Sequence, residues 1–301
     1  MRFIGKLFKD NRSNPFGFRC ADASHPPERN DSLYRPRRNF VRGRKPHSTG
    51  KILIVWRKIT MGKVILVASG KGGTGKTMFS VNFGAVLAQR GKHVMLIDLD
   101  MGLRNMDIYL GMENKVVYNI MDVISGICRI KKAMIKVDGF DTLYFMAASP
   151  RRDDRDITPL HMEVLCSKLS KYFDYIIIDC PAGIGDMLDV ALRPADQAVI
   201  LTEPEAASLR DADVAERYIR ENGVTNTVFV INKVRVDLMK AGFVPSPAAI
   251  LNMFKNPVVG MIQDDDNIHI STNKGIPIVC KRGTYIEKNF QDIADKITGL
   301  A

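Results

Sequence analysis

The stretch VILVASGKGGTGKT, residues 64–77, decides the fold. It opens with the apolar run 64–67, which is typical of a strand buried on both faces of a parallel sheet. The glycine-rich segment 70–77 follows, and a helical pattern continues over residues 77–89. A strand, a GxxxxGK[ST] loop and a helix in this order predict a phosphate-binding loop. The alternative is a glycine-rich turn that binds no ligand.

The residues of this loop have separate chemical tasks. Glycines let backbone N–H groups turn inward around phosphate oxygens, and the positive end of the following helix points at the same anion. We expect Lys76 to contact the β- and γ-phosphates and the Thr77 hydroxyl to hold Mg²⁺. The predicted nucleotide-binding residues of the loop are Gly70, Lys71, Gly72, Gly73, Thr74, Gly75, Lys76, Thr77 and Met78.

Beyond the loop, the chain alternates between short apolar runs and helical patterns. The further runs cover residues 93–97, 175–178, 197–201, 227–231 and 258–262. The helical patterns cover residues 77–89, 159–172, 207–222 and 285–297. This alternation predicts an α/β fold of the P-loop NTPase kind: a doubly wound, mostly parallel sheet with helices on both faces. Ligands in this architecture bind at the carboxyl ends of the strands.

Acidic residues follow two of the apolar runs. Asp98 and Asp100 come directly after 93–97, and Asp179 closes the run YIIID. Alternate residues of an extended segment point the same way, so Asp98 and Asp100 can both face the crevice at the strand ends. Asp179 suits the Walker B position, which holds Mg²⁺ directly or through water. For each Asp, the alternative is a strand-end turn or a helix cap.

The charge of the chain is concentrated at one end. Residues 1–60 hold 15 Lys or Arg and 4 Asp or Glu, whereas residues 61–301 hold 29 of each, so the first 60 residues account for the whole net charge of +11. Residues 10–50 are rich in Pro, Arg, Ser and Asn without a regular period, which predicts a basic, disordered extension. The alternative is that translation starts at Met61 and that residues 1–60 are not translated. We expect the ATPase domain to cover 61–301, and its neutral balance argues against nucleic-acid binding.

Two segments bear on membrane attachment. Residues 1–9, MRFIGKLFK, can form a short helix with an apolar face beside three cations, the pattern of a helix that binds anionic lipid. The alternative is a frayed or untranslated terminus. At the other end, Ile286, Phe290, Ile293 and Ile297 recur at spacings of four and three. This stripe predicts a last helix that packs on the domain. We expect a cytoplasmic protein, with peripheral attachment to the inner face of the membrane as a further hypothesis.

The chain resembles the MinD family of cell-division site-selection ATPases over about residues 62–295. GKGGTGKT is similar to the deviant Walker A motif of MinD and ParA ATPases, and DLDMGLRNMDIYLG (98–111) is similar to the MinD switch region. Further matches are VVYNIMDVISG (116–126), LYFMAASPRRD (143–153), DCPAGI (179–184) and EPEAASLRDAD (203–213). The usual basic amphipathic helix at the C-terminus has no counterpart in IEKNFQDIADKITGLA.

The resemblance implies roles for individual residues. Lys71 would reach across an ATP-bound homodimer to the partner's phosphates, and Asp100 would orient the attacking water, so that Lys71, Lys76 and Asp100 form the catalytic set. Asp98 would support the magnesium shell beside Thr77 and Asp179. Asn232, in VINK, occupies the adenine-recognition position, and Asp264 falls in a second adenine-side loop. Met78 stands where the family usually has a second Thr or Ser, and Gln263 stands in place of its usual Pro.

The resemblance also implies partners. Arg210 and Asp211, with Asn105 of the GLRN run, would meet the division inhibitor MinC and the activator MinE. ATP and Mg²⁺ would be the ligands. A related positioning ATPase for DNA partition or flagellar number is the alternative function. An iron–sulfur carrier on the same fold would need thiolates placed for a cluster, and the five cysteines form no CxxC pair.

Overall fold

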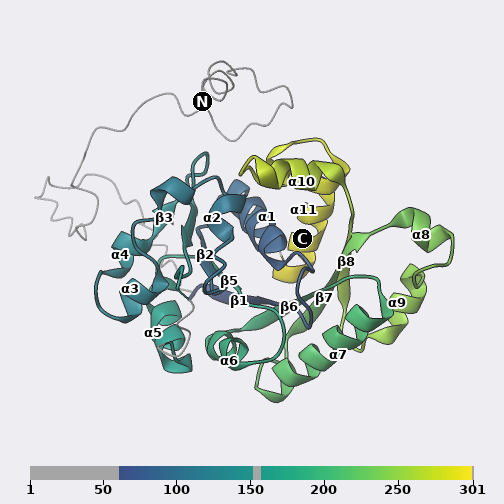
Figure 1. Ribbon diagram of the computed structural model, residues 1–301, viewed down its shortest axis with the longest axis horizontal. Helices are drawn as coiled ribbons and strands as arrows, with labels where there is room; N and C mark the ends of the chain where they lie inside the picture. Colours follow the sequence, from purple (N-terminus) through teal and green to yellow (C-terminus); the bar gives the residue numbers. More distant parts are fainter. Residues whose placement is uncertain (1–60, 152–156, 300–301) are drawn as a thin grey trace, which may run out of the picture.

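The computed structural model describes residues 61–151 and 157–299, in which one eight-stranded sheet lies between two layers of helices (Figure 1). The strand order is β3-β4-β2-β5-β1-β6-β7-β8, and every neighbouring pair is parallel except β3 and β4. The strands are β1 (Lys63–Ala68), β2 (Val94–Asp98), β3 (Ile135–Lys136), β4 (Leu143–Met146), β5 (Tyr175–Asp179), β6 (Gln197–Thr202), β7 (Thr227–Val234) and β8 (Val258–Gln263). The doubly wound, mostly parallel sheet predicted from the sequence is therefore confirmed.

Helices α1 to α9 lie between successive strands, and α10 and α11 follow the last strand. They are α1 (Lys76–Gln89), α2 (Met106–Tyr109), α3 (Ile120–Ile124), α4 (Ile130–Ala133), α5 (Pro159–Leu169), α6 (Asp186–Leu192), α7 (Ala206–Glu221), α8 (Val236–Lys240), α9 (Pro247–Met253), α10 (Asp266–Asn273) and α11 (Tyr285–Thr298), with short 3₁₀ helices η1 (Glu113–Lys115) and η3 (Ile278–Cys280). α5 ends at Leu169, before its predicted end at 172, and the Tyr172 N–H donates to the Leu169 carbonyl in the tighter turn that follows.

The apolar strands are continuous because each buries both of its faces. Along β1, Ile65 and Val67 pack into the core that contains α1 and α11, whereas Val64 and Leu66 pack into the core that contains α5, α6 and α7. Figure 1 shows these helices on opposite sides of the sheet. α1 is buried without interruption over residues 78–88. The phosphate loop, which joins β1 to α1, is thus anchored at the centre of the domain.

The last helix packs on the domain as predicted. Ile286, Phe290, Ile293 and Ile297 are all buried in the core of the α1 face, and α11 lies against β8 and α1. No helix among the described residues has the length and apolar character to cross a bilayer. The predicted basic extension, including the segment 1–9, lies outside the described residues. Whether it attaches to a membrane stays a prediction.

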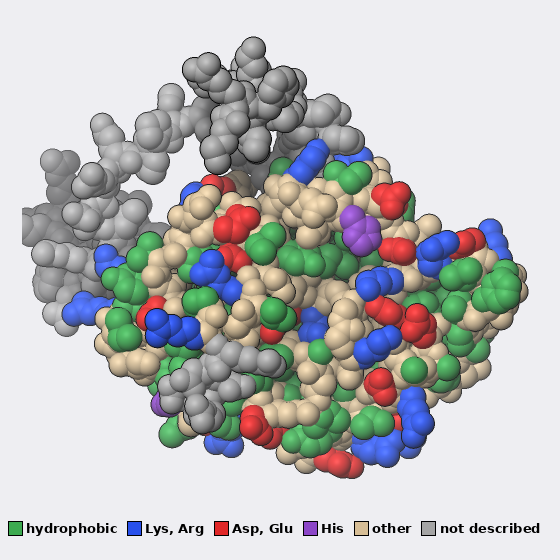
Figure 2. Space-filling view, viewed as in Figure 1, with side chains coloured by type: hydrophobic (Ala, Val, Ile, Leu, Met, Phe, Trp, Pro, Cys, Tyr) green, Lys and Arg blue, Asp and Glu red, His purple; other side chains and the backbone are tan. Residues whose placement is uncertain are grey.

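The surface of the described domain carries charges of both signs. On the face shown in Figure 2, Lys and Arg side chains are interspersed with Asp and Glu side chains. This agrees with the equal numbers of basic and acidic residues in 61–301. Nucleic-acid binding normally uses a clustered basic stripe, and the visible face has none among its coloured residues.

Candidate nucleotide-binding site

The loop between β1 and α1 lies at the carboxyl end of the sheet, where two close approaches require glycine. A Cβ on Gly70 would come within 2.3 Å of the Asp211 backbone oxygen, because the first turns of α7 pack on the start of the loop. Gly75 has φ +89°, and a Cβ there would come within 2.4 Å of the Asn232 side-chain nitrogen. The loop is therefore shaped by α7 on one side and by the end of β7 on the other.

The floor of the site is a polar cluster beneath the loop. The Lys76 ammonium donates to the Ser69 hydroxyl at 2.9 Å. The Thr77 hydroxyl donates to Asp179 at 2.6 Å, and the Ser80 hydroxyl donates to the other Asp179 oxygen at 3.2 Å. The Walker A threonine and the predicted Walker B aspartate are thus brought together from two elements, α1 and β5. These are oxygen ligands of the kind that Mg²⁺ binds.

Two buried carboxylates lie side by side at this floor. Asp98 and Asp179 are in register on the neighbouring strands β2 and β5, and both are almost fully buried. Burial raises the pKa of Asp179, against the opposing effects of the Thr77 hydroxyl and the Lys76 ammonium. Burial, and then the charge of Asp179, raise the pKa of Asp98. A divalent cation at this floor would relieve the repulsion between the two groups.

Asp98 also organises the loop that follows it. Its two carboxylate oxygens accept the backbone N–H groups of Asp100, at 2.9 Å, and Met106, at 3.3 Å. These bonds fix the segment that carries Asp100, which is partly exposed beside the floor. Because both Asp98 oxygens already accept backbone N–H groups, its magnesium role stays a prediction, whereas its role in holding the Asp100 loop is visible.

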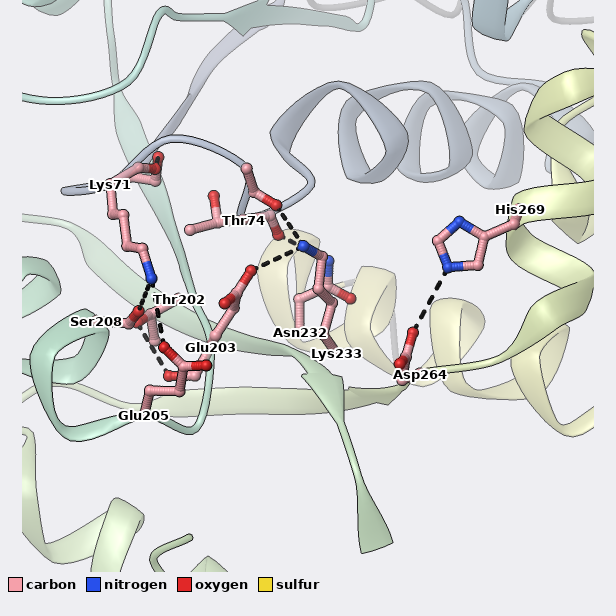
Figure 3. A network of polar contacts seen from close by, with 12 residues as sticks. Lys71, Thr74, Thr202, Glu203, Glu205, Ser208, Asn232, Lys233, Asp264 and His269 are labelled. Carbon is pink, nitrogen blue, oxygen red and sulfur yellow. Dashed lines mark hydrogen bonds and ion pairs between the residues drawn. The ribbon is translucent and has the colours of Figure 1, made fainter. Parts of the chain in front are cut away.

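Lys71 lies at the exposed rim, away from the floor. Its ammonium forms an ion pair with Glu205 at 3.3 Å and donates to the Ser208 hydroxyl at 3.3 Å (Figure 3). Glu205 is the residue before α7, and Ser208 lies in its first turn. The side chains of Lys71 and Glu205 are 43% and 57% exposed. The two lysines of the loop therefore lie in different surroundings: Lys76 at the floor beside Ser69, and Lys71 at the exposed rim beside Glu205.

A cavity of about 220 Å³ opens beside the loop at the ends of β7 and β8. Its lining includes Gly73, Gly75, Met78, Tyr109, Asn232, Lys233, Gln263, Asp264 and His269. The Asn232 amide nitrogen donates to the Thr74 carbonyl at 2.7 Å, which leaves the amide oxygen as an acceptor for a base edge. The Asp264 Oδ1 atom lies 3.7 Å from the His269 Nε2 atom (Figure 3). The structure therefore brings Asn232, Asp264 and Met78 to one cavity, next to the phosphate loop.

The loop has features that a bound phosphate and cation would satisfy. Within the described residues, the buried Thr74 hydroxyl has no hydrogen-bond partner. No atom of residues 61–151 or 157–299 lies within 4 Å of a Cβ placed on Gly72 or Gly73, so this part of the domain leaves the loop open on that side. Buried polar groups are normally paired. With Lys76 and the Thr77–Asp179 pair below, the residues present fit a nucleotide phosphate with Mg²⁺.

The predicted partner residues lie at the surface beside the rim. Arg210 and Asp211 are exposed on α7, and Asn105 is half-buried at the start of α2. The sequence reasoning did not identify Glu203, Glu205, Ser208 and Lys233 as site residues. Lys233 follows Asn232 directly, and the other three lie within the quoted run 203–213, but only the fold shows which loop groups they contact.

Comparisons with known proteins agree with this geometry. Residues 62–221 match the family model described as AAA domain. The chain is 39% identical over 240 residues to the septum site-determining protein MinD of Synechocystis, covering 79% of this chain and 90% of that protein. It is also similar to a chain of the MinC:MinD cell division protein complex of Aquifex aeolicus, with a TM-score of 0.73 and 34% identity over 79% of this chain and 96% of that one. A third relative is the septum site-determining protein MinD complexed with Mg-ADP from Pyrococcus horikoshii, with a TM-score of 0.72 and 25% identity over 80% of this chain and 97% of that one.

Proposed function

The chain belongs to the MinD family of septum site-determining ATPases, and from this premise we propose that it is a Mg²⁺-dependent ATP switch that dimerises in its ATP state. In that state it recruits a division inhibitor to the membrane and so regulates where the septum forms. The observation that carries the proposal is the division of the phosphate loop into a half-buried floor at Lys76 and an exposed rim at Lys71. The first suits hydrolysis within one chain, and the second suits contact with another.

Hydrolysis would use the floor. Lys76 would bind the β- and γ-phosphates, with Thr77 and Asp179 holding Mg²⁺ and Asp98 supporting them. When bound, Mg²⁺ supplies positive charge to neutralise the phosphate oxygens. Asp100, held by Asp98, would orient the attacking water. Catalysis of this kind depends on positioning and charge rather than on a covalent intermediate.

Dimerisation would use the rim. The ion pair between Lys71 and Glu205 is exposed, and such pairs contribute only about 0–1 kcal/mol to stability. Lys71 can therefore exchange Glu205 for the more highly charged phosphates of a nucleotide bound to the partner chain. The nucleotide would then form part of the interface, and dimer formation would depend on whether the γ-phosphate is present.

Recruitment would use the surface beside the rim. Arg210 and Asp211 are exposed on α7, and Asn105 lies at the start of α2. We assign MinC and MinE, or their equivalents, to this surface. The Aquifex relative in a MinC:MinD complex supports the inhibitor as a partner. An anionic membrane surface would be contacted through residues 1–9, and two such segments in a dimer would raise avidity.

The test is sedimentation on anionic vesicles combined with light scattering, on the full chain and on a chain that begins at Met61, with Mg-ATP and with Mg-ADP. We expect the full chain to dimerise and to sediment with ATP only. Dimerisation without sedimentation would restrict the proposal to a switch that works off this membrane. A monomer in both nucleotide states would overturn it. Strong DNA binding that weakens steeply with salt would instead favour the alternative, a positioning ATPase for DNA partition, for which the basic residues 1–60 are the supporting feature.

A further inference from the structure

Two residues at the end of β7 hold the Gly73 and Thr74 carbonyls of the phosphate loop, and we call this arrangement the clamp. Asn232 and Lys233 are consecutive, and they donate to the carbonyls of two consecutive loop residues (Figure 3). The Asn232 amide nitrogen lies 2.7 Å from the Thr74 oxygen, and the Lys233 ammonium lies 2.6 Å from the Gly73 oxygen. The predicted adenine residue is thus one half of a two-residue clamp.

Holding a carbonyl orients the N–H group of the same peptide unit. The C=O and N–H of a trans peptide are fixed in one plane and point in opposite directions. When Lys233 holds the Gly73 carbonyl, the N–H of Thr74 is turned away from Lys233. Asn232 fixes the N–H of Gly75 in the same way. A phosphate loop binds its anion through such N–H groups, so the clamp selects the direction in which two of them point.

The backbone of Lys233 is adapted to this task. The register between β7 and β8 shifts between Ile231 and Val234, and within this irregularity Lys233 adopts φ +54°. Left-handed backbone is unfavourable for a residue with a Cβ. Bulges of this kind re-aim side chains next to active sites. A Gly here would adopt the conformation without strain but would lack the ammonium group.

A buried carboxylate completes the arrangement. The Lys233 ammonium also forms an ion pair with Glu203 at 2.9 Å, and the Glu203 side chain is 13% exposed. Lys233 is therefore held from two sides, by the loop carbonyl and by Glu203. Glu203 and Glu205 lie on one short segment between β6 and α7, and Glu205 holds Lys71. This segment contacts the phosphate loop directly at Lys71, and it is linked to Gly73 through Lys233.

We infer that Lys233 is a positioning residue for nucleotide binding: it orients the Thr74 N–H of the phosphate loop through the Gly73 carbonyl, beside the Gly75 N–H that Asn232 fixes, while Glu203 holds the Lys233 ammonium in place. The inference rests on the proposed ATPase function and names a determinant of its affinity. Because the oriented N–H groups serve ADP as well as ATP, the contribution belongs to binding and not to the chemical step. Loss of such uniform binding raises KM and leaves kcat unchanged.

The experiment compares Lys233→Met with Lys233→Arg in the full chain. Titration calorimetry measures affinity for Mg-ADP, and steady-state turnover gives KM and kcat for Mg-ATP. For Lys233→Met we expect the affinity for Mg-ADP to fall about tenfold, since the bond it loses is charge-assisted. KM should rise in parallel, with kcat within about twofold of the original value. Lys233→Arg keeps a cationic donor and should restore most of the affinity.

A double variant distinguishes two possible roles of Lys233: holding the Gly73 carbonyl, and neutralising the charge of Glu203. If Lys233 serves only to pair Glu203, then Lys233→Met with Glu203→Gln removes the unpaired carboxylate and restores ADP affinity, which would overturn the inference. If Lys233 acts through the Gly73 carbonyl, the double variant stays as weak as Lys233→Met. Lys240→Met, on exposed α8, is the matched control and should not change affinity. Failure of the original chain to bind Mg-ADP would refute the proposed ATPase. Unchanged affinity in Lys233→Met alone would refute the clamp.

Discussion

The floor and the rim of the phosphate loop are held in opposite ways. At the floor, half-buried Lys76 and Thr77 and the almost fully buried Asp179 make short polar contacts. At the rim, Lys71 pairs with Glu205 in the open. Electrostatic interactions are strong where water is excluded and weak where it is not. The difference supports the proposal that the floor acts within one chain, whereas Lys71 at the rim exchanges Glu205 for the phosphates of a partner chain's nucleotide.

This comparison predicts a clear order of mutational effects on turnover. Floor substitutions remove groups that no other residue of the chain can replace. Rim substitutions change encounters between chains and leave nucleotide binding in place. The predictions below test that order, beginning with the largest expected loss.

The substitution Lys76→Ala should have the largest effect. It removes the ammonium that is aimed at the β- and γ-phosphates, and loss of one such electrostatic group costs about 10³-fold in rate. ATP turnover measured by phosphate release should therefore fall to background. Circular dichroism should remain that of the unmodified chain, because the one side-chain hydrogen bond of Lys76 within the described residues is to Ser69. Persistent turnover in a folded variant would contradict the assignment of the loop.

Asp179→Asn should lower ATP turnover without lowering the stability of the fold. The neutral amide holds a divalent cation poorly, so we expect turnover to fall about 10²-fold. Burial raises the pKa of Asp179, which means that the folded chain binds this proton more tightly than the unfolded chain. The stability that this proton contributes is lost as pH rises through the raised pKa, and the ionised group opposes folding at higher pH. The melting temperature of the variant at neutral pH should therefore be equal or higher.

Two measurements check this prediction. Calorimetric melting without nucleotide reports the stability of the floor, and phosphate release with varied Mg²⁺ reports the cation site. A melting temperature several degrees below that of the unmodified chain would show that the Thr77 and Ser80 bonds outweigh the cost of burying the charge. Unchanged turnover would remove Asp179 from the site.

Lys71→Ala should have an intermediate effect and a different signature. Its affinity for Mg-ADP should match that of the unmodified chain, because Lys71 contacts Glu205 and Ser208 rather than the floor. The ATP-dependent dimer should be lost, and turnover should fall about tenfold. Light scattering with Mg-ATP measures the first result and phosphate release the second. Glu205→Gln is the matched partner variant: it frees Lys71 and should not weaken the dimer.

The strands that the sequence predicted share one physical feature. β1, β2 and β5–β8 contain apolar runs, which are buried on both faces in all of them except the half-buried edge strand β8, so their pattern is visible without the structure. β3 has only two residues, one half-buried and one exposed, which is too short to show a period. β4, Leu143–Met146, has a partly exposed second residue and is short for a strand. Such short strands take their conformation from pairing with neighbouring strands.

In the site, too, the sequence predicted residues whose contacts are local and did not predict contacts between distant parts of the chain. Lys76 and Thr77 could be predicted because the chemistry of the loop is local, with a strand, a turn and a helix in sequence. The partners of Lys71 could not, because Glu205 and Ser208 are 134 and 137 residues away along the chain. The same holds for Lys233, which reaches Gly73 across 160 residues. Only the strand order brings the ends of β1, β6 and β7 together.

Arg210→Ala should have the smallest effect on turnover and tests whether the surface beside the rim is independent of the site. Arg210 is exposed on α7, so basal phosphate release should stay within about twofold and the melting temperature should be unchanged. Binding to a MinC-type inhibitor, measured by calorimetry with Mg-ATP present, should weaken at least about tenfold if Arg210 is an interface anchor.

Arg217→Ala, exposed further along the same helix, is the control and should bind normally. Equal loss in both variants would indicate a general charge effect. Loss of the ATP-dependent dimer in Arg210→Ala would show that rim and partner surface are one interface, because Asp211 beside it already packs on the loop at Gly70.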